Sequence, residues 1–348
     1  MRGSMGNQYS CGPCKKRDGW NVNVLKNALV GRSYRAKDCK ERINEVLQLQ
    51  RELLKLPSDY KIAIILGSDT AAVESALWNL LGCNKIDVVV HDAFSQKWYN
   101  DIANNLKLEC NKFNSSEGVN SDNDIVFTYN GTTSGKCIGN LNFIEGDRKG
   151  IVICDATSAA FAYDIDWTKI DVFTYSWQKT LGGEAGHGVI VVSPRVFERL
   201  EKYRPDRPIP LFMDLRNEAL FKGDSINTLS MLCIEDVKDA LLYMRTIDPI
   251  KKTEENAKFV YDFLDKSEIL QAVIQDKNIR SKTSITFTTE RTEVVEDVYR
   301  VMAEKKLALD IKNYKNEPIG FRIWTGPTID IKDLKNMMVE LEKTIRTL

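Results

Sequence analysis

Six short, mostly apolar runs that end at small or polar residues constrain the fold of this chain more than any other feature. They occupy residues 62–66, 88–90, 125–129, 151–154, 171–175 and 189–192. Strands without alternating polar residues are buried on both faces, which is typical of a largely parallel sheet covered by helices. Helical patterns over 71–81 and 96–106 fit between these runs. The sequence therefore predicts an α/β domain with a doubly wound, mostly parallel sheet.

The rest of the chain indicates a second, smaller domain, in keeping with its length of 348 residues. The remaining patterns predict helices at 33–56, after 229, at 294–303 and from 331 onward, and strands at 284–287 and 321–324. We predict a large domain over residues 5–245 and a small α+β domain over 246–348, on which the N-terminal segment packs. Residues 1–4, Met-Arg-Gly-Ser, are expected to be a vector-derived tag.

Charge and composition exclude several classes of protein. Lysine plus arginine and aspartate plus glutamate each number 49, so the excess of positive charge that nucleic acids and membrane surfaces attract is missing. The sequence has no apolar stretch of ~20 residues and no signal-peptide core, which favours a cytoplasmic protein. Its eight cysteines are dispersed, as is typical of reduced thiols. Cys11 and Cys14 have no second pair or nearby histidine, so we expect no metal site.

Two charged residues at strand ends are candidates for chemistry, because ligands of such sheets bind outside the carboxyl ends of the strands. Asp155 follows a run of four apolar residues. A buried carboxylate at this position is costly unless it has a cationic partner, and the alternative is that Asp155 is the N-cap of a helix. Lys179 follows the next run and is flanked by Trp177 and a glycine pair. It is either a solvated surface charge or a partly desolvated amine with the lowered pKa that a Schiff base requires. A carboxylate for the pyridinium nitrogen and an amine for the imine are what pyridoxal phosphate needs.

The segment Ser176–Gly188, Ser-Trp-Gln-Lys-Thr-Leu-Gly-Gly-Glu-Ala-Gly-His-Gly, resembles the Schiff-base segment of the phosphoserine aminotransferases. The similarity is to the archaeal and proteobacterial branch of this family, in class V of the fold-type I pyridoxal phosphate enzymes. Matching motifs lie along nearly the whole chain, at 10–14, 19–20, 31–35, 68–78, 226–231 and 320–324. The resemblance implies a fold-type I transferase with a seven-stranded sheet, a small C-terminal domain and pyridoxal phosphate as cofactor.

The resemblance also implies roles for particular residues. Lys179 would form the Schiff base and shuttle a proton, and Asp155 would keep the pyridine nitrogen protonated. Trp98 would stack on the cofactor ring, although a tryptophan on an amphipathic helix is as often part of the core. The remaining expected cofactor contacts are Ser68, Asp69, Thr70, Thr132, Ser158 and Gln178, with Asn227 and Thr228 reaching the cofactor of a partner subunit. A homodimer with shared active sites is therefore expected.

Substrate recognition is expected to rest on cations. Arg322 would bind the α-carboxylate, and Arg35 with Tyr34 and Lys315 would bind the side-chain anion. Tyr34 stands where the family usually has histidine and Lys315 where arginine is common, which puts the affinity for a substrate phosphate in question.

The implied reaction converts O-phospho-L-serine and 2-oxoglutarate to 3-phosphooxypyruvate and L-glutamate, in L-serine biosynthesis. The alternatives are a serine or alanine–glyoxylate aminotransferase, a cysteine desulfurase, or a non-catalytic homologue. A desulfurase would stack histidine on the ring, and a non-catalytic homologue would be expected to lack Lys179 or Asp155.

Overall fold

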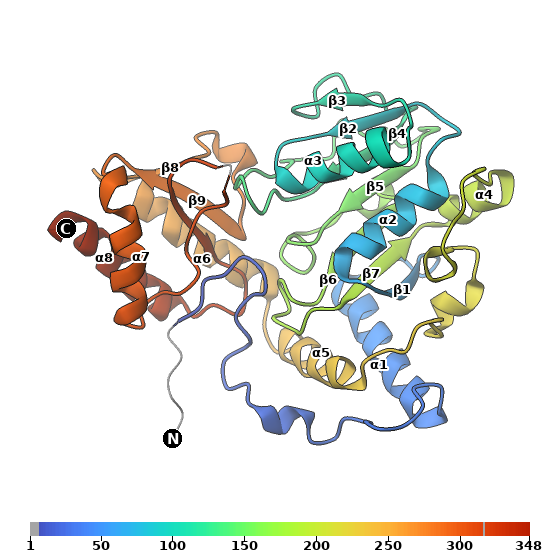
Figure 1. Cartoon of the computed structure of the whole chain (residues 1–348), viewed down its shortest axis with the longest axis horizontal. Helices are drawn as coiled ribbons and strands as arrows, with labels where there is room; N and C mark the ends of the chain where they lie inside the picture. The colour runs from blue at the N-terminus through green and yellow to red at the C-terminus, as the bar shows by residue number, and fades with distance from the viewer. Residues whose placement is uncertain (1–6, 316) are drawn as a thin grey trace.

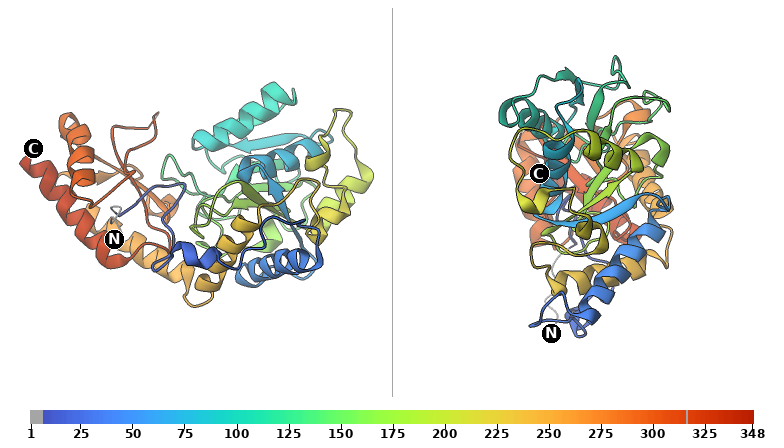
Figure 2. Two further views of the ribbon diagram at one scale, coloured as in Figure 1. Left: turned by 60° about the horizontal axis from the view of Figure 1, so that its bottom comes forward. Right: turned by 90° about the vertical axis from the view of Figure 1, so that its right-hand side faces the viewer.

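The computed structural model describes residues 7–315 and 317–348. The expected tag at residues 1–4 lies outside these ranges. A sheet of seven strands and a sheet of three strands form the centres of two bodies that lie side by side (Figures 1 and 2). Among the described helices, none is long and apolar enough to span a membrane.

The large sheet has the order β1-β7-β6-β5-β4-β2-β3, and only β7 runs antiparallel to its neighbours. Its strands are β1 (Lys61–Leu66), β2 (Ile86–Val89), β3 (Asn111–Phe113), β4 (Asp124–Thr128), β5 (Val152–Asp155), β6 (Val172–Ser176) and β7 (His187–Val192). Each of the six apolar runs forms one strand, so the predicted mostly parallel sheet is confirmed. Strand β3 was not predicted, because it is a short edge strand of largely exposed residues without an apolar run.

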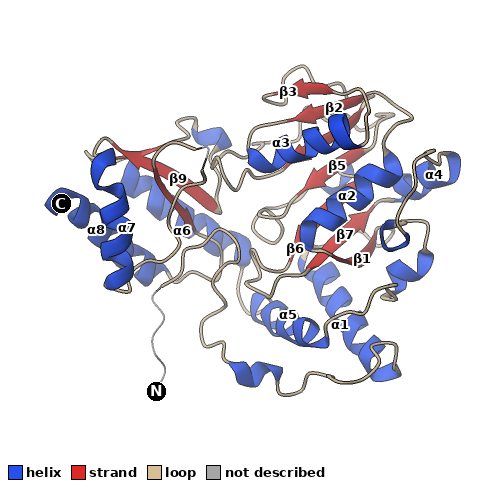
Figure 3. Cartoon of the chain, in the orientation of Figure 1, coloured by secondary structure: helices blue, strands red, loops and turns tan. Residues whose placement is uncertain are grey.

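Helices cover both faces of the large sheet, as Figure 3 shows. Successive side chains of a strand point to opposite faces. In β1, Ile62 and Ile64 therefore pack in the core with α1 (Lys37–Leu53) and α5 (Met231–Met244). Ala63 and Ile65 pack in the opposite core, whose helices are α2 (Ser68–Leu80), α3 (Ala93–Asn100) and α4 (Pro194–Lys202). Burial on both faces explains why the strand sequences show no alternation.

The small domain contains an antiparallel sheet of β8 (Leu270–Ala272), β9 (Ser284–Thr289) and β10 (Gly320–Trp324). Its helices are α6 (Pro249–Leu264), α7 (Val295–Glu304) and α8 (Ile331–Thr347). The N-terminal segment joins this body, because the Tyr9 amide donates to the Leu309 carbonyl and the Tyr9 carbonyl accepts from the Trp324 amide. The boundary near residue 245 stays a prediction; it falls between the end of α5 and the start of α6.

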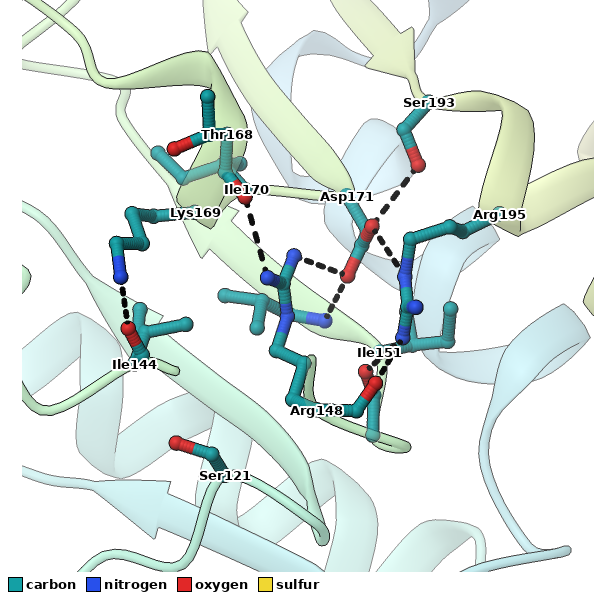
Figure 4. A network of polar contacts seen from close by, with 12 residues as sticks. Ser121, Ile144, Arg148, Ile151, Thr168, Lys169, Ile170, Asp171, Ser193 and Arg195 are labelled. Atoms are coloured by element: carbon teal, nitrogen blue, oxygen red, sulfur yellow. Dashed lines mark hydrogen bonds and ion pairs between the residues drawn. The ribbon is translucent and has the colours of Figure 1, made fainter. Parts of the chain in front are cut away.

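A buried polar network lies at the amino-terminal ends of the parallel strands of the large sheet, opposite their carboxyl ends (Figure 4). Asp171, just before β6, accepts hydrogen bonds from Arg148 at 3.0 Å, from the Val152 amide at 3.0 Å and from the Ser193 hydroxyl at 2.9 Å. Arg195 pairs with the same carboxylate at 3.1 Å. A buried carboxylate is tolerated here because every side of it has a donor.

Candidate active site

A cavity of about 270 Å³ lies at the carboxyl ends of β4 and β5, under the N-terminal segment. Most of the predicted cofactor residues line it together: Ser68, Asp69, Thr70, Trp98, Thr132, Asp155, Gln178 and Lys179. The cavity is also lined by residues that sequence reasoning did not single out, namely Gly12, Pro13, Phe94, Thr128, Asn130, Thr157 and Ala185. Parallel strands end at one edge of a sheet, which is why residues far apart in the sequence meet there.

Asp155 is fixed at the end of β5 by three hydrogen-bond donors. Its Oδ2 accepts from the Trp98 indole nitrogen at 2.8 Å, and its Oδ1 accepts from the amide and the hydroxyl of Thr157 at 2.9 and 2.6 Å. Burial raises the pKa of Asp155, and these hydrogen bonds act in the opposite direction. Thr157, two residues beyond the strand-ending aspartate, could have been found from the sequence as part of a local Asx-type turn.

Lys179 lies in the turn after β6, with a side chain that is almost entirely buried. Its amine donates a hydrogen bond to the backbone carbonyl of Cys11. Gly182, in the same turn, has φ +65°, and a Cβ there would lie 2.5 Å from the Lys15 carbonyl oxygen. The glycine therefore lets the N-terminal segment pack directly over the turn that carries Lys179.

The start of helix α2 forms a second wall of the cavity. Ser68 and Thr70 lie in its first turn, after Gly67 with φ +111°. The side-chain amide nitrogen of Gln178 lies 3.3 Å from the Ser68 hydroxyl, and its side-chain oxygen Oε1 is buried without a partner in the described structure. The Ser68 backbone amide donates to the Gly186 carbonyl at 3.2 Å. The backbone amides of Asp69 and Thr70 and the helix dipole make this helix end favourable for an anion.

Asp69 is among the residues that line the cavity, but its carboxyl group is buried beside Asp155, which the sequence did not predict. Burial and the neighbouring carboxylate together raise the pKa of Asp69 well above its ordinary value.

The loop after β4 joins the cavity to the small domain. Thr132 donates to the Ser158 hydroxyl at 2.8 Å, and its carbonyl accepts from Ser284 at 2.6 Å and from Arg322 at 3.2 Å. Ser158 thus lies behind the wall and supports Thr132 rather than lining the cavity. Arg322 is half-buried, with its guanidinium carbon 5.6 Å from the centre of the Tyr314 ring.

Four predicted site residues lie elsewhere in this chain and do not line the cavity. Tyr34 donates to the Ser225 carbonyl, and Arg35 donates to the same carbonyl at 3.2 Å. The other two, Asn227 and Thr228, lie two and three residues beyond Ser225. Arg35, Asn227 and Thr228 form one surface patch, whereas the Tyr34 side chain is buried. A fifth predicted residue, Lys315, is exposed on the loop that precedes β10.

Comparison with known proteins decides the family. A phosphoserine aminotransferase of Methanosarcina mazei is 40% identical over 345 residues, which cover 94% of this chain and 93% of that protein. The chain belongs to the phosphoserine aminotransferase family. No family profile matches the chain.

Solved structures agree with this family in fold. A phosphoserine aminotransferase from Cytophaga hutchinsonii superimposes with a TM-score of 0.86 at 22% identity, covering 97% of this chain and 98% of that one. Another from Trichomonas vaginalis, with pyridoxal phosphate bound, has a TM-score of 0.82 at 18% identity, covering 97% and 99%. The predicted resemblance and the predicted fold-type I architecture are confirmed.

Membership of the phosphoserine aminotransferase family implies pyridoxal phosphate as cofactor, and the residues of the cavity fit that group. A buried carboxylate, a buried primary amine, a helix N-terminus and the unpartnered Gln178 oxygen surround one space. These groups match the pyridinium, aldehyde, phosphate and phenolic parts of the cofactor.

Proposed function

We propose that this chain catalyses reversible amino transfer from O-phospho-L-serine to 2-oxoglutarate, which yields 3-phosphooxypyruvate and L-glutamate. The observation that carries the proposal is the meeting of Lys179 and Asp155 in one cavity of a chain that is 40% identical to an archaeal phosphoserine aminotransferase. Such a reaction belongs to L-serine biosynthesis, and we expect it in the cytoplasm.

Lys179 is proposed to hold the cofactor covalently and then to move the proton of the substrate α-carbon. Asp155 would keep a proton on the pyridine nitrogen through its negative charge, and hydrogen bonds from Trp98 and Thr157 hold that carboxylate in place. Bound pyridoxal phosphate supplies an electron sink for the carbanion at the α-carbon. Trp98, whose indole already anchors Asp155, is proposed to cover one face of the ring.

The first turn of α2 is proposed to bind the cofactor phosphate through the backbone amides of Asp69 and Thr70 and the hydroxyls of Ser68 and Thr70. Gln178 is placed to contact the phenolic oxygen. Its side-chain oxygen Oε1 has no partner within the described structure, and its side-chain nitrogen Nε2 is directed to Ser68. Thr132, supported by Ser158, completes the wall on the side of the small domain.

Arg322 is proposed to bind the α-carboxylate of every substrate. Its position at the Thr132 carbonyl places a fixed positive charge next to the cavity. Planar Arg–carboxylate pairing with two hydrogen bonds fixes the orientation of the α-carbon. Lys315, on the loop beyond Tyr314, is proposed as one cation for the substrate phosphate.

The active protein is proposed to be a homodimer with shared sites. The patch of Arg35, Asn227 and Thr228, and the buried Tyr34 next to it in sequence, do not line the cavity of their own chain. The patch lies beside exposed apolar side chains, Val30 at 57%, Ile226 at 46% and Leu232 at 48% exposure, which a second subunit would cover. Arg35 and Thr228 would then reach the partner's substrate and cofactor.

Two alternatives are less well supported. The same fold occurs in other aminotransferases, so the fold by itself does not select the amino donor. A desulfurase needs a nucleophilic cysteine, and no cysteine is among the residues that line the described cavity. A non-catalytic homologue would have no reason to retain both Lys179 and Asp155.

A panel of amino donors with 2-oxoglutarate tests the proposal directly. We expect phosphoserine to exceed serine and alanine in kcat/KM by at least about a hundredfold, the value of one or two charge-assisted contacts. Lys179→Ala should abolish both the reaction and the borohydride trapping of cofactor on the protein, whereas Lys97→Ala, at the cavity rim, should retain trapping. Preference for an unphosphorylated donor would overturn the substrate assignment.

A further inference from the structure

Asp69 belongs to the cavity wall, and its carboxyl group is buried without a hydrogen-bond donor in the described structure. Only 5% of the residue is exposed, and neither carboxyl oxygen has a hydrogen-bond partner among the described residues. Asp155, in the same wall, accepts hydrogen bonds from Trp98 and Thr157. Two neighbouring buried carboxyl groups thus have very unequal environments.

The charged groups around Asp69 do not neutralise it. No ion pair to Asp69 occurs in residues 7–315 or 317–348. The Lys179 amine is engaged by the Cys11 carbonyl, and the Lys97 amine lies 3.5 Å from the Thr70 hydroxyl at the exposed rim. The remaining neighbours are Asp155 and the hydroxyls of Thr157 and Thr174. The two hydroxyls lower the pKa of Asp69, but burial and Asp155 raise it by more.

Electrostatics then decides where a shared proton resides. Burial without hydrogen-bond donors makes the ionised form of a carboxyl group unfavourable, and a second negative charge beside it adds repulsion. Both effects raise the pKa of Asp69. Asp155 offsets its own burial with three donors, so it is the better place for the single charge.

We propose that Asp69 is a neutral carboxylic acid in the working enzyme and confines the negative charge of the pair to Asp155. This inference rests on the proposed contact between Asp155 and the pyridinium nitrogen. An ionised Asp69 in the first turn of α2 would place a negative charge beside the cofactor phosphate and repel it. A neutral Asp69 leaves that turn favourable for the phosphate and leaves Asp155 as the single anion for the ring nitrogen. Asp69 is therefore a positioning residue that acts through Asp155 and the helix end.

Infrared spectroscopy of the wild-type protein tests the protonation state directly, with and without cofactor. We expect the carbonyl stretch of a buried carboxylic acid at neutral pH, its shift in deuterium oxide, and its loss in Asp69→Asn. Absence of this band from the wild-type protein overturns the proposal, and so does a band that persists unchanged in a folded Asp69→Asn variant. If the variant does not fold, absence of the band from the wild-type protein still overturns the proposal.

Equilibrium binding of pyridoxal phosphate gives an independent readout. The amide of Asp69→Asn resembles a neutral acid in shape and charge, so we expect its dissociation constant to stay within about threefold of wild type across neutral pH. If Asp69 were ionised, removal of its charge next to the phosphate would tighten binding by about tenfold or more. A change beyond threefold in either direction overturns the proposal.

Asp155→Asn separates this inference from the proposed function. It should weaken the cofactor and alter the absorbance of the lysine-bound form, which Asp69→Asn should leave at the wild-type position. An Asp155→Asn variant with wild-type affinity and spectrum would remove the assigned role of Asp155, while the infrared band would still report the proton on Asp69.

Discussion

The amine of Lys179 donates a hydrogen bond to the backbone carbonyl of Cys11, which lies 168 residues earlier in the chain. The N-terminal segment therefore covers the residue proposed to hold the cofactor. It is anchored on the other side by the small domain, through the Tyr9 backbone. Access to the cavity and the position of the lysine are thus both set by a segment outside the large sheet.

Gly12→Ala should displace Lys179 more than it destabilises the fold. A Cβ at Gly12 would lie 2.3 Å from the Lys179 amine nitrogen, and the residue has φ +146°. The lysine tip is flexible and can move away, so we expect a loss of about 1 kcal/mol in the free energy of unfolding. Covalent cofactor attachment, measured by borohydride trapping, should fall at least about tenfold. Gly146→Ala, where no atom lies within 4 Å, should change neither quantity.

Arg322→Ala and Arg35→Ala should distinguish recognition of the substrate α-carboxylate from recognition of the substrate phosphate. Loss of Arg322 should weaken all amino and keto acids, because all of them carry the α-carboxylate. Loss of Arg35 should raise KM for phosphoserine by one to two decades, because a charge-assisted contact contributes ~1.5–3 kcal/mol. The KM values for serine and alanine should not change. Lys315→Ala should behave like Arg35→Ala, and the exposed Arg300→Ala serves as a control. Unchanged phosphoserine kinetics in Lys315→Ala would leave that residue as a solvated loop lysine.

Mixed dimers should recover activity if sites are shared. Thr228→Ala is expected to damage the partner's site, and Lys179→Ala is expected to damage its own. In a heterodimer of the two variants, both lesions fall on one site and the other site stays intact. We expect up to half of the wild-type activity per dimer, measured on purified heterodimers with two different tags. Heterodimers as inactive as the parents would contradict sharing.

Asp171→Asn should cost about 3–5 kcal/mol of unfolding free energy, because it leaves the fully buried Arg148 without its carboxylate. The matched control is Asp122→Asn, which removes an exposed pair with Lys149 at 3.4 Å and should cost no more than about 1 kcal/mol. Urea denaturation of both variants checks the difference. Equal losses would mean that the network in Figure 4 contributes little to the large sheet.

His187 should make stability depend on pH below neutrality. It stacks on Trp177 with ring centres 4.8 Å apart, and burial lowers its pKa from 6.5 to about 4. Between these two pH values the unfolded chain binds a proton at His187 that the folded chain does not. The free energy of unfolding therefore rises with pH, by up to about 3 kcal/mol in total, and this contribution is complete above pH 6.5. His187→Phe keeps an aromatic stack and should lose this component in urea titrations at several pH values. An unchanged slope would assign the pH dependence to other groups.

The large sheet could be predicted from the sequence because burial on both faces leaves a local signature, an unbroken apolar run. Strand β3 and the β8 edge of the small sheet leave no such signature, since β3 is largely exposed and β8 has only three residues. The first helix was predicted from 33 but begins at Lys37, because residues before it turn to bring Tyr34 onto the Ser225 carbonyl.

The sequence by itself determined the family and the sheet and singled out Lys179 and Asp155 as candidates, because these depend on local patterns and on motifs that can be recognised in one dimension. Only the tertiary structure decided that the carboxyl group of Asp69 lies beside Asp155, that the Cys11 carbonyl accepts a hydrogen bond from Lys179, and that Arg35 and Thr228 do not line the cavity of their own chain. These relations join residues tens to hundreds of positions apart, and they depend on which loops meet at the strand ends. No pattern along a single segment carries that information, because chain folding alone brings those segments together.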